Sequence, residues 1–319
     1  GQVRDDVDFG YRGALTQGLG DFVFEDINGN GRQDGGEPGI DGVAVELYDA
    51  PGVNLLATTT TAGGGAYSFP GLTPGDYQVF FADNDGSTTY VRAAANSPVA
   101  IEATDSDASE TTGFAGPVTV AAATFNNDVD AGLYLEASVG DRVWYDVNGN
   151  GAQEGGEPGL DGVTVFLDYS GLDGVFGTGD DALGISSDVT SGGGNYLFNN
   201  LRPGTYRTRV NNGTLPNGIT DPTSDLDGIG TADQATFTLV SGQNRTDADF
   251  GYQGLGAIGD FVWNDQNADT VQDAGEPGIP AVDVTLLWAG FDGSLGNGDD
   301  ISYIATTNGS GIYGFPNLP

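Results

Sequence analysis

Cysteine, histidine, lysine and methionine are all absent from the 319-residue chain. Without cysteine the chain can form neither a disulfide bond nor a thiolate metal site, so cysteine usage does not indicate a redox compartment. The absence of both cysteine and histidine argues against zinc and most transition-metal chemistry. No segment approaches the roughly 18 consecutive apolar residues of a membrane-spanning helix, so no membrane insertion is expected in this segment.

Positive charge is also scarce. Nine basic residues, all arginine, face 46 acidic ones, which gives a formal net charge of −37. The electrostatic field of so much negative charge repels nucleic acids and anionic membranes, so we expect neither as a partner. Hydrophobic residues make up 38% of the chain, too many for a disordered acidic tail. The length allows two or three domains with their own cores.

The acid is mostly aspartate, with 37 Asp against 9 Glu among the 46 acidic residues. Aspartate is the shorter acid, which suits turns and oxygen cages, whereas acid that only increases solubility is usually spread over both types. We therefore favour metal-binding loops. Salt adaptation remains open as an additional explanation.

An acidic 12-residue loop occurs three times, at residues 26–37, 146–157 and 265–276. The first two copies match the calcium-loop pattern D-x-[DN]-x-[DN]-G-x5-E, which surrounds a hard ion with about six to eight oxygens. The third copy has Thr270 at the position of the turn glycine, so we expect it to bind more weakly or to bend differently. The offsets of 120 and 119 residues indicate a duplicated module that carries a metal site.

The predicted ligands occupy loop positions 1, 3, 5, 7, 9 and 12, with a backbone carbonyl acting at position 7. They are Asp26, Asn28, Asn30, Arg32, Asp34 and Glu37; Asp146, Asn148, Asn150, Ala152, Glu154 and Glu157; and Asp265, Asn267, Asp269, Val271, Asp273 and Glu276.

Motifs on both sides of the loop repeat with it. A Gly-Asp-x-Val-Phe/Trp motif precedes each loop. A run of alternating apolar residues follows each loop, as in Val43, Val45 and Leu47. A period of two predicts strands with one buried face. Short strands separated by Gly, Pro and Asn/Asp turns, without a helical period, predict an all-β sandwich. Strands beside the loop exclude the helical EF-hand domain.

The repeats predict the domain boundaries. We expect the last strand of a preceding module at residues 1–13, complete modules at 18–136 and 138–253, and an incomplete module at 257–319. On this interpretation the chain is a window on a longer repeat array.

Together with Tyr-x-Phe-x-x-Leu-x-Pro-Gly-x-Tyr, as at residues 67–77 and 196–206, and the closing Asp-Phe-Gly-Tyr of residues 249–252, these motifs resemble the SdrD B-like family. This family, the B domain of serine-aspartate-repeat adhesins, is related to the Cna-B modules of bacterial surface adhesins. The resemblance covers essentially the whole chain. It implies tandem prealbumin/immunoglobulin-like β-sandwich domains with EF-hand-like calcium loops, which serve as stalk units of secreted or wall-associated proteins. The Lys–Asn isopeptide bond of some Cna-B relatives cannot form in a chain without lysine.

A second acidic motif, Asp-Gly-x-x-Gly-x-Gly-Asp-Asp, occurs at residues 173–181 and 292–300. Its glycines would let three carboxylates converge, which predicts a second calcium site. A hairpin with solvated acids remains the alternative, and the first module lacks the motif. The predicted ligands are Asp173, Asp180 and Asp181, and Asp292, Asp299 and Asp300.

The pattern predicts a calcium-binding structural repeat of a large secreted or cell-surface protein, a calcium-stiffened stalk or extracellular fibre. Calcium is the only expected cofactor. Adjacent modules, or identical chains in a rod or fibre, are the expected partners, and the location is a cell surface or secreted matrix. A ligand-binding adhesin module that recognises a host protein or glycan is the alternative. Paired carboxylates could also hydrolyse glycosides, but a duplicated catalytic site in every stalk unit argues against an enzyme, and no catalytic residue is predicted.

Overall fold

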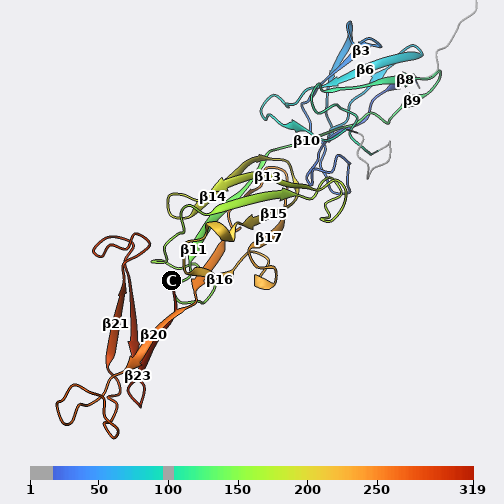
Figure 1. Ribbon diagram of the computed structural model, residues 1–319. Helices are drawn as coiled ribbons and strands as arrows, with labels where there is room; N and C mark the ends of the chain where they lie inside the picture. The colour runs from blue at the N-terminus through green and yellow to red at the C-terminus, as the bar shows by residue number, and fades with distance from the viewer. Residues whose placement is uncertain (1–16, 96–103) are drawn as a thin grey trace, which may run out of the picture.

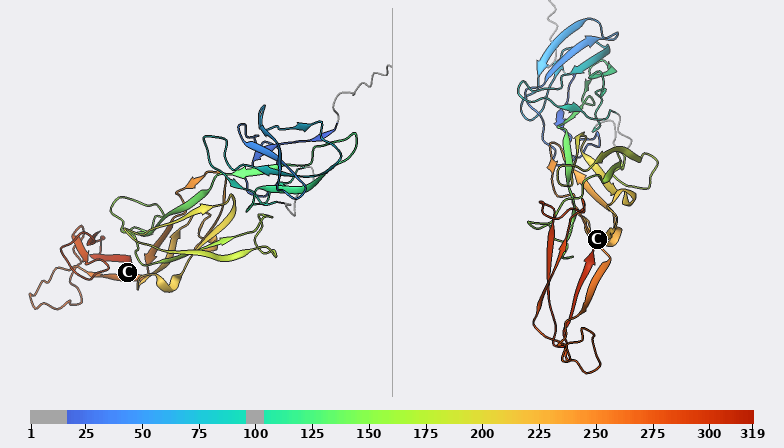
Figure 2. Two further views of the ribbon diagram at one scale, coloured as in Figure 1. Left: turned by 90° about the horizontal axis from the view of Figure 1, so that it is seen from above. Right: turned by 60° about the vertical axis from the view of Figure 1, so that its left-hand side comes forward.

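The computed structural model describes residues 17–95 and 104–319 as three β-rich bodies that follow one another along an elongated molecule (Figures 1 and 2). The strand expected at residues 1–13 lies outside the described residues. Within the described ranges the only helical segments are two 3-10 turns, η1(Asn212–Thr214) and η2(Ile229–Thr231). The predicted all-β fold is confirmed. No helix in the described part is long and apolar enough to cross a membrane.

Module 1 packs a four-stranded antiparallel sheet, in the order β4-β3-β6-β8, against shorter strands that form two three-stranded sheets. The strands of the larger sheet are β3(Ala44–Asp49), β4(Leu55–Thr60), β6(Gly75–Phe81) and β8(Phe114–Val120). The opposite layer holds β1(Gly18–Leu19), β2(Val23–Glu25), β5(Phe69–Pro70), β7(Val91–Arg92), β9(Phe125–Asn126) and β10(Ala131–Tyr134). In that layer the closing strand β10 runs parallel to β2.

Module 2 repeats this topology. Its antiparallel sheet has the order β13-β12-β15-β17, with β12(Thr164–Tyr169), β13(Ala182–Val189), β15(Gly204–Val210) and β17(Gln234–Leu239). The facing sheet contains β11(Ala137–Tyr145), β14(Asn195–Leu201), β16(Ile219–Ser224), β18(Asn244–Arg245) and β19(Phe250–Gly254). The closing strand β19 again pairs in parallel with the strand before the acidic loop.

The alternating apolar runs form the cores of these two modules, as predicted. Val45 and Leu47 are 0% exposed, and so are Val165 and Leu167. The residues between them on β3 and β12 face away from the core, which is the arrangement a period of two requires. Burying each such side chain contributes about 1.5–3 kcal/mol.

Module 3 consists, in the described residues, of two two-stranded antiparallel sheets. One pairs β20(Gly256–Phe261) with β23(Ile312–Leu318), and the other pairs β21(Asp283–Trp288) with β22(Ile301–Thr306). Ile301 joins the core cluster of module 2, and Trp288 and Tyr303 pack against it. The two modules therefore share an apolar boundary.

Candidate metal loops at the module joints

The acidic loops of modules 1 and 2 are each fixed at their first residue to the closing strand of their own module. The Asp26 N–H donates to the Leu133 carbonyl at 2.8 Å, and the Asp146 N–H donates to the Tyr252 carbonyl at 2.8 Å. Loop 1 (residues 26–37) follows β2 directly, and loop 2 (residues 146–157) follows β11. Each loop thus begins at the end of the strand that pairs in parallel with the closing strand of its module.

Backbone N–H groups organise loop 1 around its first and last carboxylates. Asp26 accepts from the N–H groups of Gly29 and Gly31, both at 2.8 Å. Glu37 accepts from Ile27 N–H at 2.7 Å and from Asp34 N–H at 2.8 Å. The two carboxylates therefore close the loop into a compact ring.

The same scaffold recurs in the other two copies. In loop 2, Glu157 accepts from Val147 N–H and Glu154 N–H, both at 3.0 Å. In loop 3 (residues 265–276), Glu276 accepts from Gln266 N–H at 2.8 Å and from Asp273 N–H at 3.1 Å. The local sequence pattern is therefore sufficient to specify the loop conformation in three different surroundings.

The side chains at loop positions 3, 5 and 9 converge on one spot. In loop 1 the amide nitrogens of Asn28 and Asn30 donate to Asp34 Oδ2 at 2.8 and 2.9 Å. In loop 2 the amides of Asn148 and Asn150 donate to the Glu154 carboxylate at 2.7 and 3.1 Å. Each copy thus gathers amide and carboxylate groups at the centre of its loop.

Left-handed backbone at positions 4 and 6 makes the tight bend. Gly29 and Gly31 both have φ of 73°, a conformation that glycine adopts without a steric penalty. In loop 3 the same conformation is adopted by Ala268, at φ 60°, and by Thr270, at φ 69°. The third loop therefore keeps the same bend, with side chains in an unfavourable backbone region.

The donor set of the loops suits calcium in its chemistry, although the carboxylates alone do not form a cage. Among residues 17–95 and 104–319, no group of three or more His, Cys, Asp or Glu side chains is arranged to hold a metal ion. The oxygens available in each loop are mixed carboxylate, amide and backbone carbonyl groups, which is the set that calcium takes. The ligands proposed from the sequence stay a prediction.

Burial disfavours the charged form of the carboxylates in the acidic loops. Asp26 is 0% exposed; burial raises the pKa of its carboxyl, although the N–H groups of Gly31 and Gly29 partly offset the shift. Burial also raises the pKa of Glu37 to about 7, and it raises the pKa of Glu157 in loop 2. A bound cation would favour the charged form of each of these groups.

The second acidic motif also folds the same way twice. In module 2, Asp180 accepts from Leu172 N–H at 2.9 Å and Asp181 accepts from Gly177 N–H at 2.7 Å. In module 3 the equivalent Asp299 accepts from Phe291 N–H at 3.1 Å, and Asp300 from Gly296 N–H at 2.6 Å. Backbone donors therefore hold these acids within their own loops, and the second calcium site stays a prediction.

Loop 1 lies at the joint between modules 1 and 2 and contacts the second module through its backbone. The Ile27 carbonyl accepts from Ser241 N–H at 2.9 Å, and the Gly29 carbonyl accepts from Arg202 Nη2 at 3.2 Å. The linker residue Leu135 exchanges hydrogen bonds with the same segment, through Gly242 N–H at 3.0 Å and Ser241 Oγ at 2.9 Å. The sequence did not identify Ser241, which lies in no motif, or Arg202, which occupies a variable position of the motif at residues 196–206.

The joint between modules 2 and 3 uses equivalent surfaces with different chemistry. The hydroxyls of Tyr145 and Tyr303 share a hydrogen bond at 2.8 Å, and the Tyr145 hydroxyl also donates to the Asn317 carbonyl at 3.1 Å. The Tyr145 ring meets the edge of Trp288, with centroids 5.6 Å apart. Aromatic packing therefore dominates this joint.

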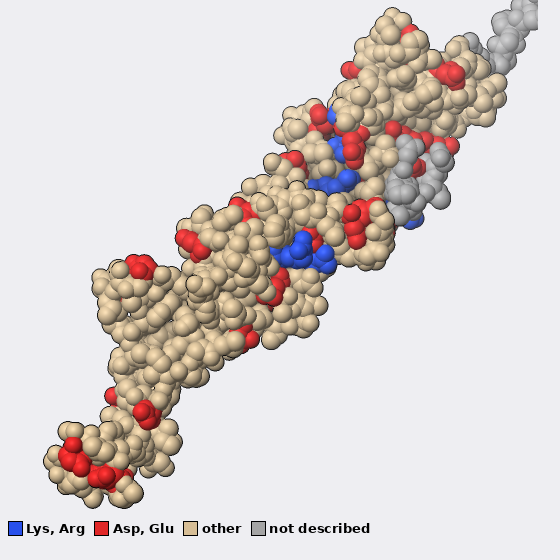
Figure 3. Space-filling view, in the orientation of Figure 1, with Lys and Arg blue, Asp and Glu red and all other residues tan. Residues whose placement is uncertain are grey.

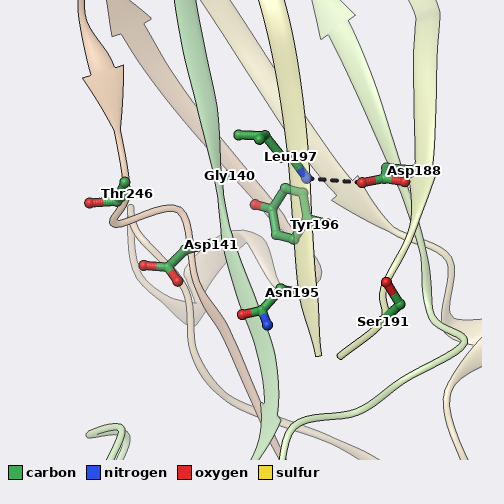
Figure 4. A pocket seen from close by; sticks show the side chains of 8 residues that line it. All are labelled: Gly140, Asp141, Asp188, Ser191, Asn195, Tyr196, Leu197 and Thr246. Carbon is green, nitrogen blue, oxygen red and sulfur yellow. Dashed lines mark hydrogen bonds between the residues drawn. The ribbon is translucent and has the colours of Figure 1, made fainter. Parts of the chain in front are cut away.

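A shallow hollow of about 360 Å³ lies on the side of module 2, where β13 and β14 form the edges of the two sheets. Figure 4 shows its lining, including Asp188, which accepts from Leu197 N–H at 2.9 Å. This bond satisfies a backbone donor on the outer strand, which protects the sheet edge. The hollow contains none of the predicted ligands.

Comparison with known proteins agrees with the repeat structure. Serine-aspartate repeat-containing protein F of Staphylococcus epidermidis is 34% identical over 98% of this chain and 16% of its own length. Serine-aspartate repeat-containing protein D of Staphylococcus aureus strain MW2 is 35% identical over 88% of this chain and 20% of its own length. The chain thus spans about a fifth or less of the length of these relatives. The minor pilin of Streptococcus agalactiae overlaps 75% of this chain and 96% of its own at 12% identity, but a TM-score of 0.28 carries no argument.

The SdrD B-like domain family matches residues 17–133, 137–252 and 256–319. These three matches cover most of the chain and confirm the resemblance that the motifs indicated. The chain belongs to the SdrD B-like domain family.

Proposed function

We propose that this chain is a stalk segment of a cell-surface or secreted protein and that calcium in the acidic loops stiffens it. The succession of modules along one axis (Figure 2) and the family membership support the stalk. The partners are then the adjacent modules and, if chains associate, identical chains in a fibre. The position of loop 1 at a joint supports the role of calcium.

The observation that carries this proposal is the pair of hydrogen bonds from module 2 to the loop 1 backbone. Because Ile27 and Gly29 are both loop residues and both accept bonds from the next module, the order of the loop affects the order of the joint. An ion that orders loop 1 would therefore also reinforce those two contacts.

In each loop the ion would be held by the carboxylates at positions 1, 9 and 12, the side chains at positions 3 and 5, and the carbonyl at position 7. When bound, calcium supplies positive charge that offsets the repulsion among the acids. Sites in extracellular calcium modules typically bind with dissociation constants of about 10⁻⁴–10⁻³ M. A permanently calcium-rich exterior would keep such sites filled.

The test compares thermal unfolding and limited proteolysis of the full chain in calcium, in magnesium and in chelator. Saturating calcium, at about 100 times the dissociation constant, would stabilise the folded state by about 2.7 kcal/mol per site. We expect a higher melting temperature and slower cleavage within the acidic loops in calcium. Equal melting and equal cleavage with and without calcium would refute the stiffening role.

A matched pair of variants assigns the effect to the loops. Glu157→Gln removes the position-12 carboxylate of loop 2, whereas Glu136→Gln removes an exposed acid between modules. Both variants change the net charge by the same amount. We expect the calcium response to fall in Glu157→Gln and to remain in Glu136→Gln; an equal loss in both would indicate a nonspecific charge effect.

A further inference from the structure

Arg202 of module 2 reaches three separate parts of module 1. It lies in the turn between β14 and β15, and its Nη2 donates to the Gly29 carbonyl at 3.2 Å. Its Nη1 lies 3.7 Å from Glu110 Oε1, and its guanidinium stands 5.9 Å from the centre of the Tyr134 ring. One cationic side chain thus connects the acidic loop, another acid and the closing strand of the first module.

The backbones of the two modules approach closely beside this contact. A Cβ added to Gly29 would lie 2.2 Å from the Pro203 carbonyl oxygen, and Gly29 has φ of +73°. Only glycine fits at this loop position, both because of its conformation and because of the space left by module 2. The turn that contains Arg202 therefore packs directly against loop 1.

Positive charge is valuable at this place because loop 1 carries Asp26, Asp34 and Glu37 against a single arginine of its own. Gly29, whose carbonyl accepts from Arg202, also donates its N–H to the buried Asp26 carboxylate at 2.8 Å. The guanidinium thus acts on the buried carboxylate from across the module boundary. On the face in Figure 3 the positive groups gather over the middle of the molecule, and acidic groups are spread along its length.

The second joint is built differently at the equivalent position. Pro319 occupies the place that corresponds to Arg202, one residue after the leucine of the Tyr-x-Phe-x-x-Leu phrase. A Cβ on Gly149, the counterpart of Gly29, would meet the neutral amides of Gln253 at 2.5 Å and Asn317 at 3.3 Å. Loop 2 therefore faces amide groups where loop 1 faces a guanidinium.

We propose that Arg202 is a tethered cation that partly neutralises loop 1 from the neighbouring module and fastens this joint when no metal is bound. The inference rests on the proposed function only in treating residues 26–37 as the metal loop. It adds a regulatory consequence: as calcium falls, the joint between modules 1 and 2 stays aligned.

The absence of cysteine allows a direct test in the full chain. Cysteines are introduced at the exposed Thr58 in β4 and Ser187 in β13, and each carries a spin label. Pulsed electron paramagnetic resonance then measures the distance between the label on module 1 and the label on module 2. The variants are Arg202→Gln, the charge-conserving Arg202→Lys, and Arg245→Gln. Arg245 is a suitable control because it pairs with Asp247 of its own module at 2.7 Å.

In chelator we expect one narrow distance peak for the unsubstituted chain, Arg202→Lys and Arg245→Gln, and loss of that peak for Arg202→Gln. Calcium should restore the peak in Arg202→Gln. A broad distribution for the unsubstituted chain in chelator, a narrow one for Arg202→Gln, or equal broadening in Arg245→Gln would overturn the proposal. Calcium that leaves melting and proteolysis unchanged would refute the stiffening function, while the chelator result would still decide the role of Arg202.

Discussion

Modules 1 and 2 share one backbone frame but place different chemistry at the positions that face outward. Their four-stranded sheets have the same order, and inward residues such as Val45 and Val165 are equally buried, at 0% exposure. On the outer face, Tyr48 of module 1 corresponds to Asp168 of module 2. The inward positions therefore specify the sandwich, whereas the outward ones decide how each module contacts its surroundings.

The clearest difference lies directly before the acidic loops, where Glu25 in module 1 corresponds to Tyr145 in module 2. Tyr145 is 0% exposed and belongs to an aromatic cluster with Trp288 and Phe291. The ring centroids of Trp288 and Phe291 are 4.8 Å apart. Glu25 is half-buried, and its joint is held by backbone and arginine contacts instead. One joint therefore depends on apolar packing and the other on polar contacts.

The largest effect should come from removing this aromatic anchor. Tyr145→Ala leaves a cavity in the core of module 2 and in the joint, which we expect to cost about 3–5 kcal/mol of unfolding free energy. The matched Glu25→Ala should change stability by no more than about 0.5 kcal/mol. Urea unfolding followed by far-ultraviolet circular dichroism measures this difference, because it reports on the strands of every module. Similar costs for both variants would show that the joints are energetically alike.

The second largest effect concerns the outer face of the sheet in module 2. Asp168 is 0% exposed and accepts from Arg207 Nη2 and Arg209 Nε, both at 2.7 Å. Burial disfavours its charge, but the bonds from Arg209, Gly184 N–H and Arg207 outweigh this and lower the pKa of Asp168 to about 2.

Asp168→Asn leaves two adjacent guanidinium groups without their counter-charge, so we expect a loss of about 3 kcal/mol. The corresponding change in module 1, Tyr48→Phe, removes one hydrogen bond to Glu46 on an accessible face and should cost no more than about 0.5 kcal/mol. Chemical denaturation of both variants checks the difference. If Asp168→Asn were as mild as Tyr48→Phe, the ion triad would contribute nothing to stability.

The next effect depends on pH and contrasts Asp130 with Asp249, the equivalent acids before the two closing strands. Burial, together with the charge of Asp21, raises the pKa of Asp130 to about 8. Burial, together with Asp141, raises the pKa of Asp249 to about 6. Both carboxyls therefore keep a proton in the folded state at a pH where the unfolded chain has released it.

The stability that these two protonated carboxyls contribute is complete below the ordinary pKa of an aspartate, at about 4. It is lost as pH rises through the folded-state pKa of each group. Without divalent ions we expect stability to fall between about pH 4 and 8, by at most about 1.4 kcal/mol per pH unit for each group. Asp130→Asn should flatten that slope up to pH 8, and Asp249→Asn only up to pH 6. Melting temperatures of the unsubstituted chain and both variants across this pH range measure the slope. An unchanged slope in Asp130→Asn would mean that Asp130 is already ionised.

Much of this structure could be predicted from the sequence because its signals are local. The alternation around Val45 and Val165 indicated which face is buried, and the spacing of the acidic and amide side chains specified the same loop three times. The joints could not be predicted, since Arg202 reaches a loop 173 residues earlier in the chain from a variable position of its motif. The burial of Asp130 was equally hidden, because it depends on how β10 packs beside β2.

The smallest effect separates loop 2 from loop 3 at one position. Thr270 adopts φ of 69° where loop 2 has Gly151 at 74°, and a side chain in this region costs about 1–2 kcal/mol. Thr270→Gly should therefore stabilise loop 3 by about 1 kcal/mol and, if the loop binds calcium, tighten binding by up to about tenfold. Hydrogen exchange at residues 265–276 and calorimetric titration measure the two effects.

The reverse change, Gly151→Thr, should weaken loop 2 by more than the backbone strain alone, because a Cβ there lies 3.0 Å from the Thr223 carbonyl oxygen. If neither substitution changed exchange or binding, the turn glycine would not set the strength of these loops.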